Sequence, residues 1–268
     1  MQLSELHDHM FELLCLVDDI CKKENVRYFL VAGSELGAVR EKNFIPWDDD
    51  VDIMVLREDY DAFKDAMQKH LSDRYIYLEP SDVAPKFYDF ASRVIDKEVV
   101  IRRETEDDKF YDAYRNNLCI DVFTFEMGTD NKLAQKMHLI KCKCLYGMAM
   151  SKRVKIDYEK RGLVEKISVF SCSLIGRMFS MNKILKMWDR LTQKYSHKKS
   201  LYRFSANAMP RDMIFYDSDI YEDVVYFPIR DREFPVPVGY DKELTMHYGD
   251  YMKPREDHEY FTQHLYEE

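Results

Sequence analysis

The chain has 268 residues and is acidic, with 40 Lys or Arg against 49 Asp or Glu and a net charge of −9. This balance argues against a general nucleic-acid binder, because such a protein needs a basic surface to replace phosphate counterions. Apolar residues make up 46% of the chain, so a sizeable core can be buried and disorder is not expected. The length fits one large domain, or a compact core with an appended lobe.

The cysteine pattern and the hydropathy indicate the compartment. None of the six cysteines forms a C-x-x-C pair, which favours free thiols in a reducing environment over disulfides. No secretory leader is visible, and no run reaches 18 apolar residues. We therefore expect a soluble, cytoplasmic protein.

The first half of the chain alternates predicted helices and strands. Apolar residues at helical spacing between residues 3 and 20 predict an amphipathic helix that packs on the core. The apolar run over residues 28–32 predicts a buried strand, and a helix is expected to start over residues 35–40. Further strands are predicted over residues 51–56, 75–78, 87–101 and 120–125, with a helix over residues 59–70.

The second half begins with helices and returns to strands. Helices are predicted over residues 133–150 and 163–195, strands over 224–229 and 234–238, and a last helix over 240–248 that ends at Gly249. This order predicts an α/β (α+β) fold, in which a mixed β-sheet is flanked by helices and carries a helical lobe. We expect a single domain over residues 1–268, with a catalytic core (20–130), a helical lobe (131–200) and C-terminal strands and a helix that complete it (201–268).

Two acidic residues on one strand carry the main chemical signal. Asp50 and Asp52 are two positions apart, so their side chains share one face of the predicted strand, while Val51 and Ile53 face the core. Two carboxylates this close repel unless a cation neutralises them. Mg²⁺ prefers oxygen ligands and typically uses one or two carboxylates together with substrate phosphates. The pattern predicts a site for Mg²⁺ or Mn²⁺ that serves phosphoryl chemistry.

Asp121 is the best candidate for a third carboxylate. It is an isolated acid within an apolar strand, which is costly unless it binds a cation or pairs with a base. Asp50, Asp52 and Asp121 are therefore predicted as catalytic residues and as metal ligands, with Asp121 as the base or as a ligand only. The alternative for Asp121 is a salt bridge to a core Arg or Lys.

The segment before these acids is suited to phosphate. A strand that leads into Gly33-Ser34 and a helix start offers free backbone N–H groups and a hydroxyl. Gly33 permits close approach of the backbone, and Arg40 has a fork that suits phosphate oxygens. The alternative is that Gly33-Ser34 is only a turn.

Three segments resemble the LicD family, which belongs to the nucleotidyltransferase superfamily and includes fukutin and fukutin-related protein. Gly-Ser-Glu-Leu-Gly-Ala-Val-Arg at 33–40, with Phe-Ile-Pro-Trp-Asp-Asp-Asp-Val-Asp-Ile at 44–53, resembles the family signature. Ile120 to Phe123 is similar to its middle strand, and Tyr248 to Met252 with Pro254 resembles its C-terminal motif. The first match is long and specific, and the three together span most of the chain.

The resemblance implies a nucleotidyltransferase-like mixed sheet, with Asp50, Asp52 and Asp121 in the three metal-carboxylate positions and Gly33 and Ser34 in the Gly-Ser position. It also implies an activity: transfer of phosphocholine, or of a related alditol phosphate, from a CDP-activated donor to a hydroxyl of a cell-surface glycan. Teichoic acid and lipopolysaccharide are the usual acceptors, often lipid-linked at the cytoplasmic membrane face. The alternatives are a nucleotidyltransferase that releases pyrophosphate from a nucleoside triphosphate, and an inactive protein that binds nucleotide or glycan.

Several residues complete the predicted substrate site. Trp47 is a candidate for stacking on cytosine or for a cation–π contact with choline, and the alternative is packing under the Asp loop. Arg93 is a candidate for donor phosphates, or else a structural arginine. The predicted substrate-binding set is Gly33, Ser34, Arg40, Trp47, Asp48, Asp49 and Arg93.

The chain departs from the family pattern at Glu35, Glu41 and Asn43, where a neutral residue, a basic residue and a glycine are usual. The added negative charge would weaken anion binding or favour a cationic group such as choline. A peripheral contact with the membrane is an option for residues 163–188, where Lys166, Arg177, Lys183 and Lys186 lie among apolar residues. An ordinary pair of core helices is the alternative.

Overall fold

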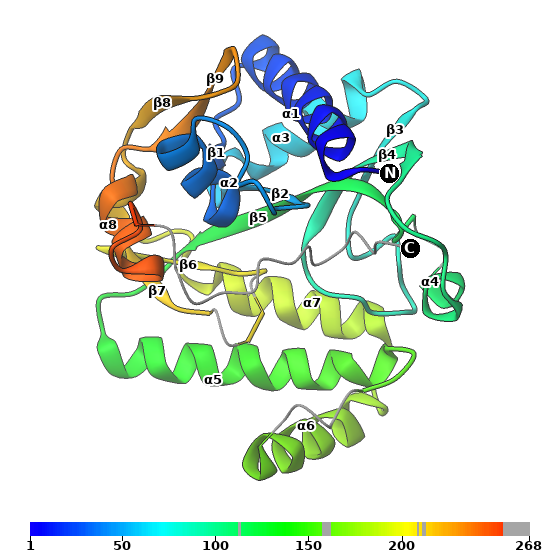
Figure 1. The fold of residues 1–268 in the computed structure, drawn as a ribbon. Helices are drawn as coiled ribbons and strands as arrows, with labels where there is room; N and C mark the ends of the chain where they lie inside the picture. Colours follow the sequence, from blue (N-terminus) through cyan, green and yellow to red (C-terminus); the bar gives the residue numbers. More distant parts are fainter. Residues whose placement is uncertain (112–113, 157–161, 208, 211–212, 254–268) are drawn as a thin grey trace.

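The computed structural model describes residues 1–111, 114–156, 162–207, 209–210 and 213–253, and a seven-stranded mixed sheet forms its centre (Figure 1). Five strands follow the order β1-β2-β5-β4-β3, and β6 and β7 extend the sheet beyond the end of β5. The strands are β1 (Phe29–Leu30), β2 (Val51–Leu56), β3 (Tyr75–Leu78), β4 (Ser92–Val100), β5 (Asn117–Met127), β6 (Tyr202–Ser205) and β7 (Phe215–Asp217).

The central pair, β2 and β5, is parallel, and every other pair in this sheet is antiparallel. Alternate residues of β2 and β5 face a core under α1 (Leu3–Glu24) and α3 (Arg57–His70). Val51, Ile53 and Ile120 are completely buried on that face. Since side chains alternate along a strand, Asp52 and Asp121 must lie on the other face.

The remaining N-terminal and C-terminal elements border the sheet. A short helix α2 (Ala32–Leu36) continues into a π-helical turn, η1 (Gly37–Glu41), and α8 (Tyr240–Tyr248) contacts α2. A separate ribbon of two strands, β8 (Val224–Ile229) and β9 (Arg232–Pro237), packs on the α1 side of the core. Two further short helices are α4 (Glu106–Tyr111) and η4 (Ser218–Tyr221).

A helical layer lies below the sheet in Figure 1 and has an apolar cluster of its own. It consists of α5 (Lys132–Ala149), η2 (Met150–Lys152), α6 (Leu163–Gly176), α7 (Met181–Thr192) and η3 (Gln193–Tyr195). Trp188 of α7 stacks on Phe90, with ring centroids 3.7 Å apart, and so joins this layer to the segment before β4. No helix in the described part of the chain is both long and apolar enough to cross a membrane.

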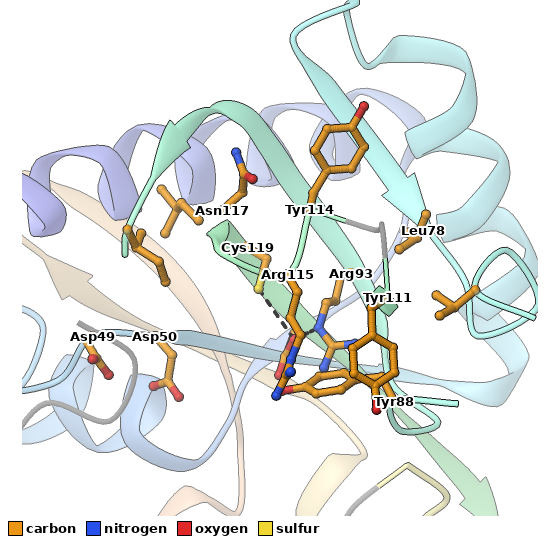
Figure 2. Close-up of a pocket in the computed structure, with 14 residues that line it drawn as sticks. Asp49, Asp50, Leu78, Tyr88, Arg93, Tyr111, Tyr114, Arg115, Asn117 and Cys119 are labelled. Atoms are coloured by element: carbon orange, nitrogen blue, oxygen red, sulfur yellow. Dashed lines mark hydrogen bonds and ion pairs between the residues drawn. The ribbon is translucent and has the colours of Figure 1, made fainter. Parts of the chain in front are cut away.

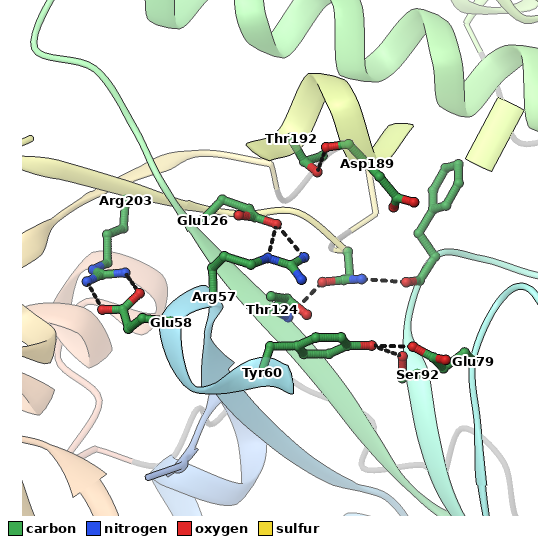
Figure 3. A network of polar contacts seen from close by, with 12 residues as sticks. Arg57, Glu58, Tyr60, Glu79, Ser92, Thr124, Glu126, Asp189, Thr192 and Arg203 are labelled. Carbon is green, nitrogen blue, oxygen red and sulfur yellow. Dashed lines mark hydrogen bonds and ion pairs between the residues drawn. The ribbon is translucent and has the colours of Figure 1, made fainter. Parts of the chain in front are cut away.

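Polar contacts fix α3 to the strands that follow it (Figure 3). Arg57, the first residue of α3, donates from Nε to Glu126 of β5 at 2.8 Å, and the Glu126 side chain is completely buried. Arg203 of β6 pairs with Glu58. Because the buried carboxylate of Glu126 requires a partner, the first ion pair holds the start of α3 beside the end of β5, and the second links α3 to β6.

The α/β class with a mixed sheet and flanking helices is confirmed. The strand expected over residues 28–32 is shorter in the structure, where β1 covers only Phe29–Leu30. It ends early because Ala32 adopts φ 51° and turns the chain into α2. The helix expected over residues 163–195 is interrupted, since Ser180 caps a new helix by accepting from the N–H of Lys183. The short elements α4, β6 and β7 were not predicted from the sequence.

Candidate active site

Three charged side chains form a row across adjacent strands. Asp52 of β2 is paired in register with Asp121 of β5, and Asp121 is paired in register with Arg93 of β4. Residues opposite one another in a sheet project from the same face, so the three side chains are neighbours. Asp50 lies two residues before Asp52, and Cys119 lies two residues before Asp121. The sheet therefore brings together the acids that the sequence predicted.

Arg93 supplies the positive charge in this row. Its Nε lies 2.8 Å from Oδ1 of Asp121, and its terminal nitrogens bind Asp89 at 3.1 and 2.6 Å. Burial works against the charge on Arg93, but Asp121 and Asp89 outweigh burial and raise the pKa of the guanidinium. The salt bridge to a core arginine, weighed as the alternative for Asp121, is thus present, and Arg93 has a positioning role.

The carboxylates repel one another strongly. Burial raises the pKa of Asp52 well above its ordinary value, and the charges of Asp50, Asp121 and Asp48 raise it further, against the opposing effect of Arg93. Cys119 adjoins the row, with Sγ 3.8 Å from Oδ1 of Asp121. Burial, followed by the charge of Asp121, raises the pKa of this thiol. It is therefore protonated at neutral pH.

The donor set matches a hard divalent cation in its chemistry. Carboxylate oxygens are the preferred ligands of Mg²⁺, and a cation would relieve the repulsion around Asp52. The described residues, however, contain no group of three His, Cys, Asp or Glu side chains arranged around a common point for a metal. Asp121 is directed to Arg93 instead, so a cation at this site would compete with that guanidinium for the Asp121 carboxylate.

Gly33 and Ser34 shape the acidic loop. The Ser34 hydroxyl is buried and accepts a hydrogen bond from the backbone N–H of Asp52, at 2.9 Å. A Cβ added at Gly33 would lie 2.6 Å from Oδ2 of Asp48, so only glycine lets this carboxylate approach the backbone. The Gly-Ser pair is therefore more than a turn, because it fixes the start of β2 and the position of Asp48.

Arg40 and Trp47 are used in contacts within the protein. Arg40 donates from Nε to Glu41 at 2.6 Å and from Nη1 to the carbonyl of Tyr251 at 3.0 Å, which ties the first motif to the C-terminal one. Trp47 packs against an apolar cluster that includes Leu244 and Tyr251. These contacts favour the packing alternative for Trp47. Pro254, the last residue of the C-terminal motif, lies outside the described residues.

A pocket opens beside the row (Figure 2). Asp49 and Asp50 border one side, and Arg93, Asp121 and Cys119 lie along β4 and β5. Four further residues that line it were not predicted from the sequence: Tyr88, Tyr111, Tyr114 and Arg115. All four lie in or beside loops that precede β4 or β5. The one feature of the sequence that could have indicated them is that they come just before the strands that carry Arg93 and Asp121.

Arg115 gives the pocket a second guanidinium. Its guanidinium carbon lies 4.4 Å from the ring centroid of Tyr88 and 5.1 Å from that of Tyr111. Its Nη1 lies 3.7 Å from Asp108, and its buried Nε has no hydrogen-bond partner among the described residues. The pocket thus combines Asp49 and Asp50 on one side with two arginines on the other, one of which pairs with Asp121. This arrangement suits a metal-bound phosphate or diphosphate.

The C-terminal motif reaches the same site. Burial raises the pKa of Tyr248, and the charges of Asp52 and Asp48 raise it further, which places this phenol within the field of the acidic residues. The resemblance had identified Tyr248 only as part of a motif, without a contact to the acids.

Glu35 and Glu243 form a second acidic pair between α2 and α8. Both are buried, at 0% and 2% exposure, and neither carboxyl oxygen of Glu35 has a hydrogen-bond partner within the described chain. Burial raises the pKa of Glu35 well above its ordinary value, with Glu243 adding to the effect. The raised pKa favours the protonated form of Glu35, which works against the negative charge that we expected this residue to bring to the phosphate site.

The segment that carries this site is similar to known proteins. Residues 25–143 match the family model described as LicD/FKTN/FKRP, nucleotidyltransferase domain. The row from Asp52 to Arg93 lies within the matched residues. Over 255 residues the chain is 26% identical to the lipopolysaccharide cholinephosphotransferase LicD of Haemophilus influenzae, covering 89% of this chain and 87% of that protein.

Shorter matches exist to two uncharacterized proteins, one from Rickettsia prowazekii and one from Rickettsia typhi. Each is 38% identical over 50 residues, which is 19% of this chain and 19% or 16% of the relative.

The buried acidic pair predicts a pH-dependent stability. Burial raises the pKa of Glu243 from 4.5 to about 7. Above pH 4.5 the unfolded state loses the Glu243 proton, whereas the folded state keeps it up to about pH 7. The stability that the protonated carboxyl contributes to the fold is therefore lost as the pH rises through about 7. Between these values the wild type should lose up to about 1.4 kcal/mol of unfolding free energy per pH unit relative to Glu243→Gln.

Urea denaturation of both proteins across this pH range measures the difference. The exposed Glu222→Gln is the matched control, and its pH dependence should follow that of the wild type. An equal pH slope in the wild type and in Glu243→Gln would contradict the assignment.

Proposed function

We propose that this protein is a LicD-type phosphotransferase. It transfers phosphocholine, or a related alditol phosphate, from a CDP-activated donor to a hydroxyl of lipopolysaccharide or of another cell-surface glycan such as teichoic acid. The observation that carries the proposal is the in-register row of Asp52, Asp121 and Arg93 within the residues that match the LicD-family model. The similarity to a lipopolysaccharide cholinephosphotransferase over most of both chains supports the phosphocholine donor and the glycan acceptor.

The residues divide into two groups by role. Asp50 and Asp52 would hold Mg²⁺ or Mn²⁺ with Asp121, and the ion would neutralise charge on the donor phosphates when bound. Arg93 orients Asp121 through their 2.8 Å contact. Arg115 binds a donor phosphate from the opposite side of the pocket.

The reaction is a displacement at phosphorus. The acceptor oxygen attacks the phosphorus atom that bears choline or the alditol, and the bond from that phosphorus to the bridging oxygen breaks, so CMP leaves. We assign the proton of the acceptor hydroxyl to the carboxylate of Asp121, because Asp121 lines the pocket. Tyr88, Tyr111 and Tyr114 line the same pocket and would form part of the wall around the reacting phosphate.

A donor screen with the purified protein tests this function. CDP-choline, CDP-ribitol, CDP-glycerol and each nucleoside triphosphate are incubated with Mg²⁺ and a lipopolysaccharide or teichoic acid acceptor, and CMP and pyrophosphate are measured. We expect CMP from one CDP donor, loss of turnover with EDTA, and a decrease of at least about a hundredfold in kcat for Asp52→Asn.

Asp61→Asn, an exposed change on α3, is the matched control and should keep wild-type turnover. Pyrophosphate from a triphosphate would instead identify a nucleotidyltransferase. Turnover near the wild-type level in Asp52→Asn would show that the row is not the catalytic centre.

Arg115 should act mainly in donor binding. Its replacement removes charge-assisted hydrogen bonds worth about 1.5–3 kcal/mol, so Arg115→Gln should raise the KM for the CDP donor about ten- to a hundredfold and change kcat less. Steady-state kinetics at saturating acceptor measure both constants. The exposed Arg190→Gln on α7 is the control, and an unchanged KM in Arg115→Gln would remove this residue from the donor site.

A further inference from the structure

The outer face of α6 exposes a continuous apolar stripe. Six large side chains of α6 and of the turn that follows it are each between 54% and 82% exposed, and from Val164 onward they recur every three or four residues, which is the spacing of one helix face. They are Leu163, Val164, Ile167, Phe170, Leu174 and Met178. A helix that packs on a core shows the opposite pattern, so this face calls for a partner outside the described chain.

The orientation of α6 is set by its packing on α5. A Cβ added at Gly176 would lie 2.1 Å from the carbonyl oxygen of Met148, and one added at Gly147 would lie 2.8 Å from Cβ of Cys172. These close approaches show that small residues form the α5–α6 contact. Because the small residues face inward, the large apolar residues are held outward and are exposed. The helix α6 itself lies at the edge of the molecule, below α5 in Figure 1.

The helical layer is also strongly basic. Residues 131–200 contain 17 Lys or Arg and four Asp or Glu, whereas the whole chain has 40 and 49. Many exposed basic side chains of this layer form no ion pair within the described part of the chain, among them Lys141, Lys143, Arg177, Lys183 and Lys186. The apolar stripe thus belongs to the one region of an acidic protein that carries a large positive charge.

We propose that α6 docks on the surface of an anionic lipid bilayer. An interfacial helix inserts its apolar side chains among the acyl chains while neighbouring lysines and arginines contact anionic headgroups, and this layer offers both features. With 14 residues, α6 is too short to span a bilayer, which takes about 20 residues.

Two other occupants fit the surface less well. A nucleic acid would use the basic side chains, but it offers nothing to an exposed stripe of leucine, isoleucine and phenylalanine. A second copy of the chain would cover the stripe, but a symmetric contact would bring two strongly basic layers together. A membrane partner meets both the apolar and the basic requirement. This inference does not depend on the proposed function, although it would place the protein where lipid-linked acceptors occur.

Vesicle co-sedimentation without donor or acceptor tests the docking surface. The full-length protein is mixed with phosphatidylcholine vesicles that contain phosphatidylglycerol, or with pure phosphatidylcholine vesicles. We expect binding to the anionic vesicles that weakens as salt is raised. Phe170→Glu should weaken this binding about tenfold, because one large apolar side chain no longer inserts. Tyr226→Glu on β8 is the matched control, since Tyr226 is 53% exposed and Phe170 is 59% exposed.

Several outcomes would overturn the proposal. The first is that the wild type does not bind anionic vesicles. The second is that Phe170→Glu and Tyr226→Glu lose vesicle binding equally. The third is that salt does not weaken the binding. If the wild type does not bind vesicles but forms a concentration-dependent dimer that Phe170→Glu dissociates, the surface binds a second copy of the chain. If it does not bind vesicles but retains single-stranded RNA, the surface binds nucleic acid. Circular dichroism confirms that both variants are folded.

Discussion

The repulsion among carboxylates at the β2–β5 pair is the constraint on which the candidate site depends. In-register pairing places Asp52 directly beside Asp121, and Asp50 and Asp48 add to the field that raises the pKa of Asp52. Such an arrangement is unfavourable unless positive charge is supplied. Arg93 supplies part of it, and Arg93 is in turn fixed by Asp89 and by the ring of Tyr88, 4.9 Å away.

The rest of the structure keeps these acids together despite their repulsion. The opposite faces of β2 and β5 pack on α1 and α3, so the strands cannot separate without exposing a large core. Ser34 fixes the backbone at Asp52, and the missing side chain at Gly33 admits Asp48. Arg40 then joins this loop to the carbonyl of Tyr251, which brings the C-terminal motif to the acids. Gly33, Ser34 and Arg40 therefore act mainly by holding the loop that carries the carboxylates in position.

The acids could be predicted from the sequence because strand periodicity is local: the alternation from Asp50 to Ile53 alone assigns each side chain to a face. The partner of Asp121 could not be identified, since Arg93 pairs with it through strand register, which depends on distant residues. The pocket residues Tyr88 and Arg115 lie in loops without periodicity. β6 and β7 are four and three residues long, too short for a clear pattern. The raised pKa of Glu35 follows from its burial beside Glu243, which sequence spacing does not reveal.

The proposed mechanism depends on a divalent-cation site that Asp50, Asp52 and Asp121 form across two parallel strands. Crystals grown with Mn²⁺ and a CDP donor, measured at the manganese absorption edge, test this site directly. We expect an anomalous difference peak about 2.2 Å from carboxylate oxygens of Asp52 and at least one of the other two acids. A fully ordered donor with no such peak, or with the manganese bound elsewhere and Asp121 still paired only with Arg93, would contradict it.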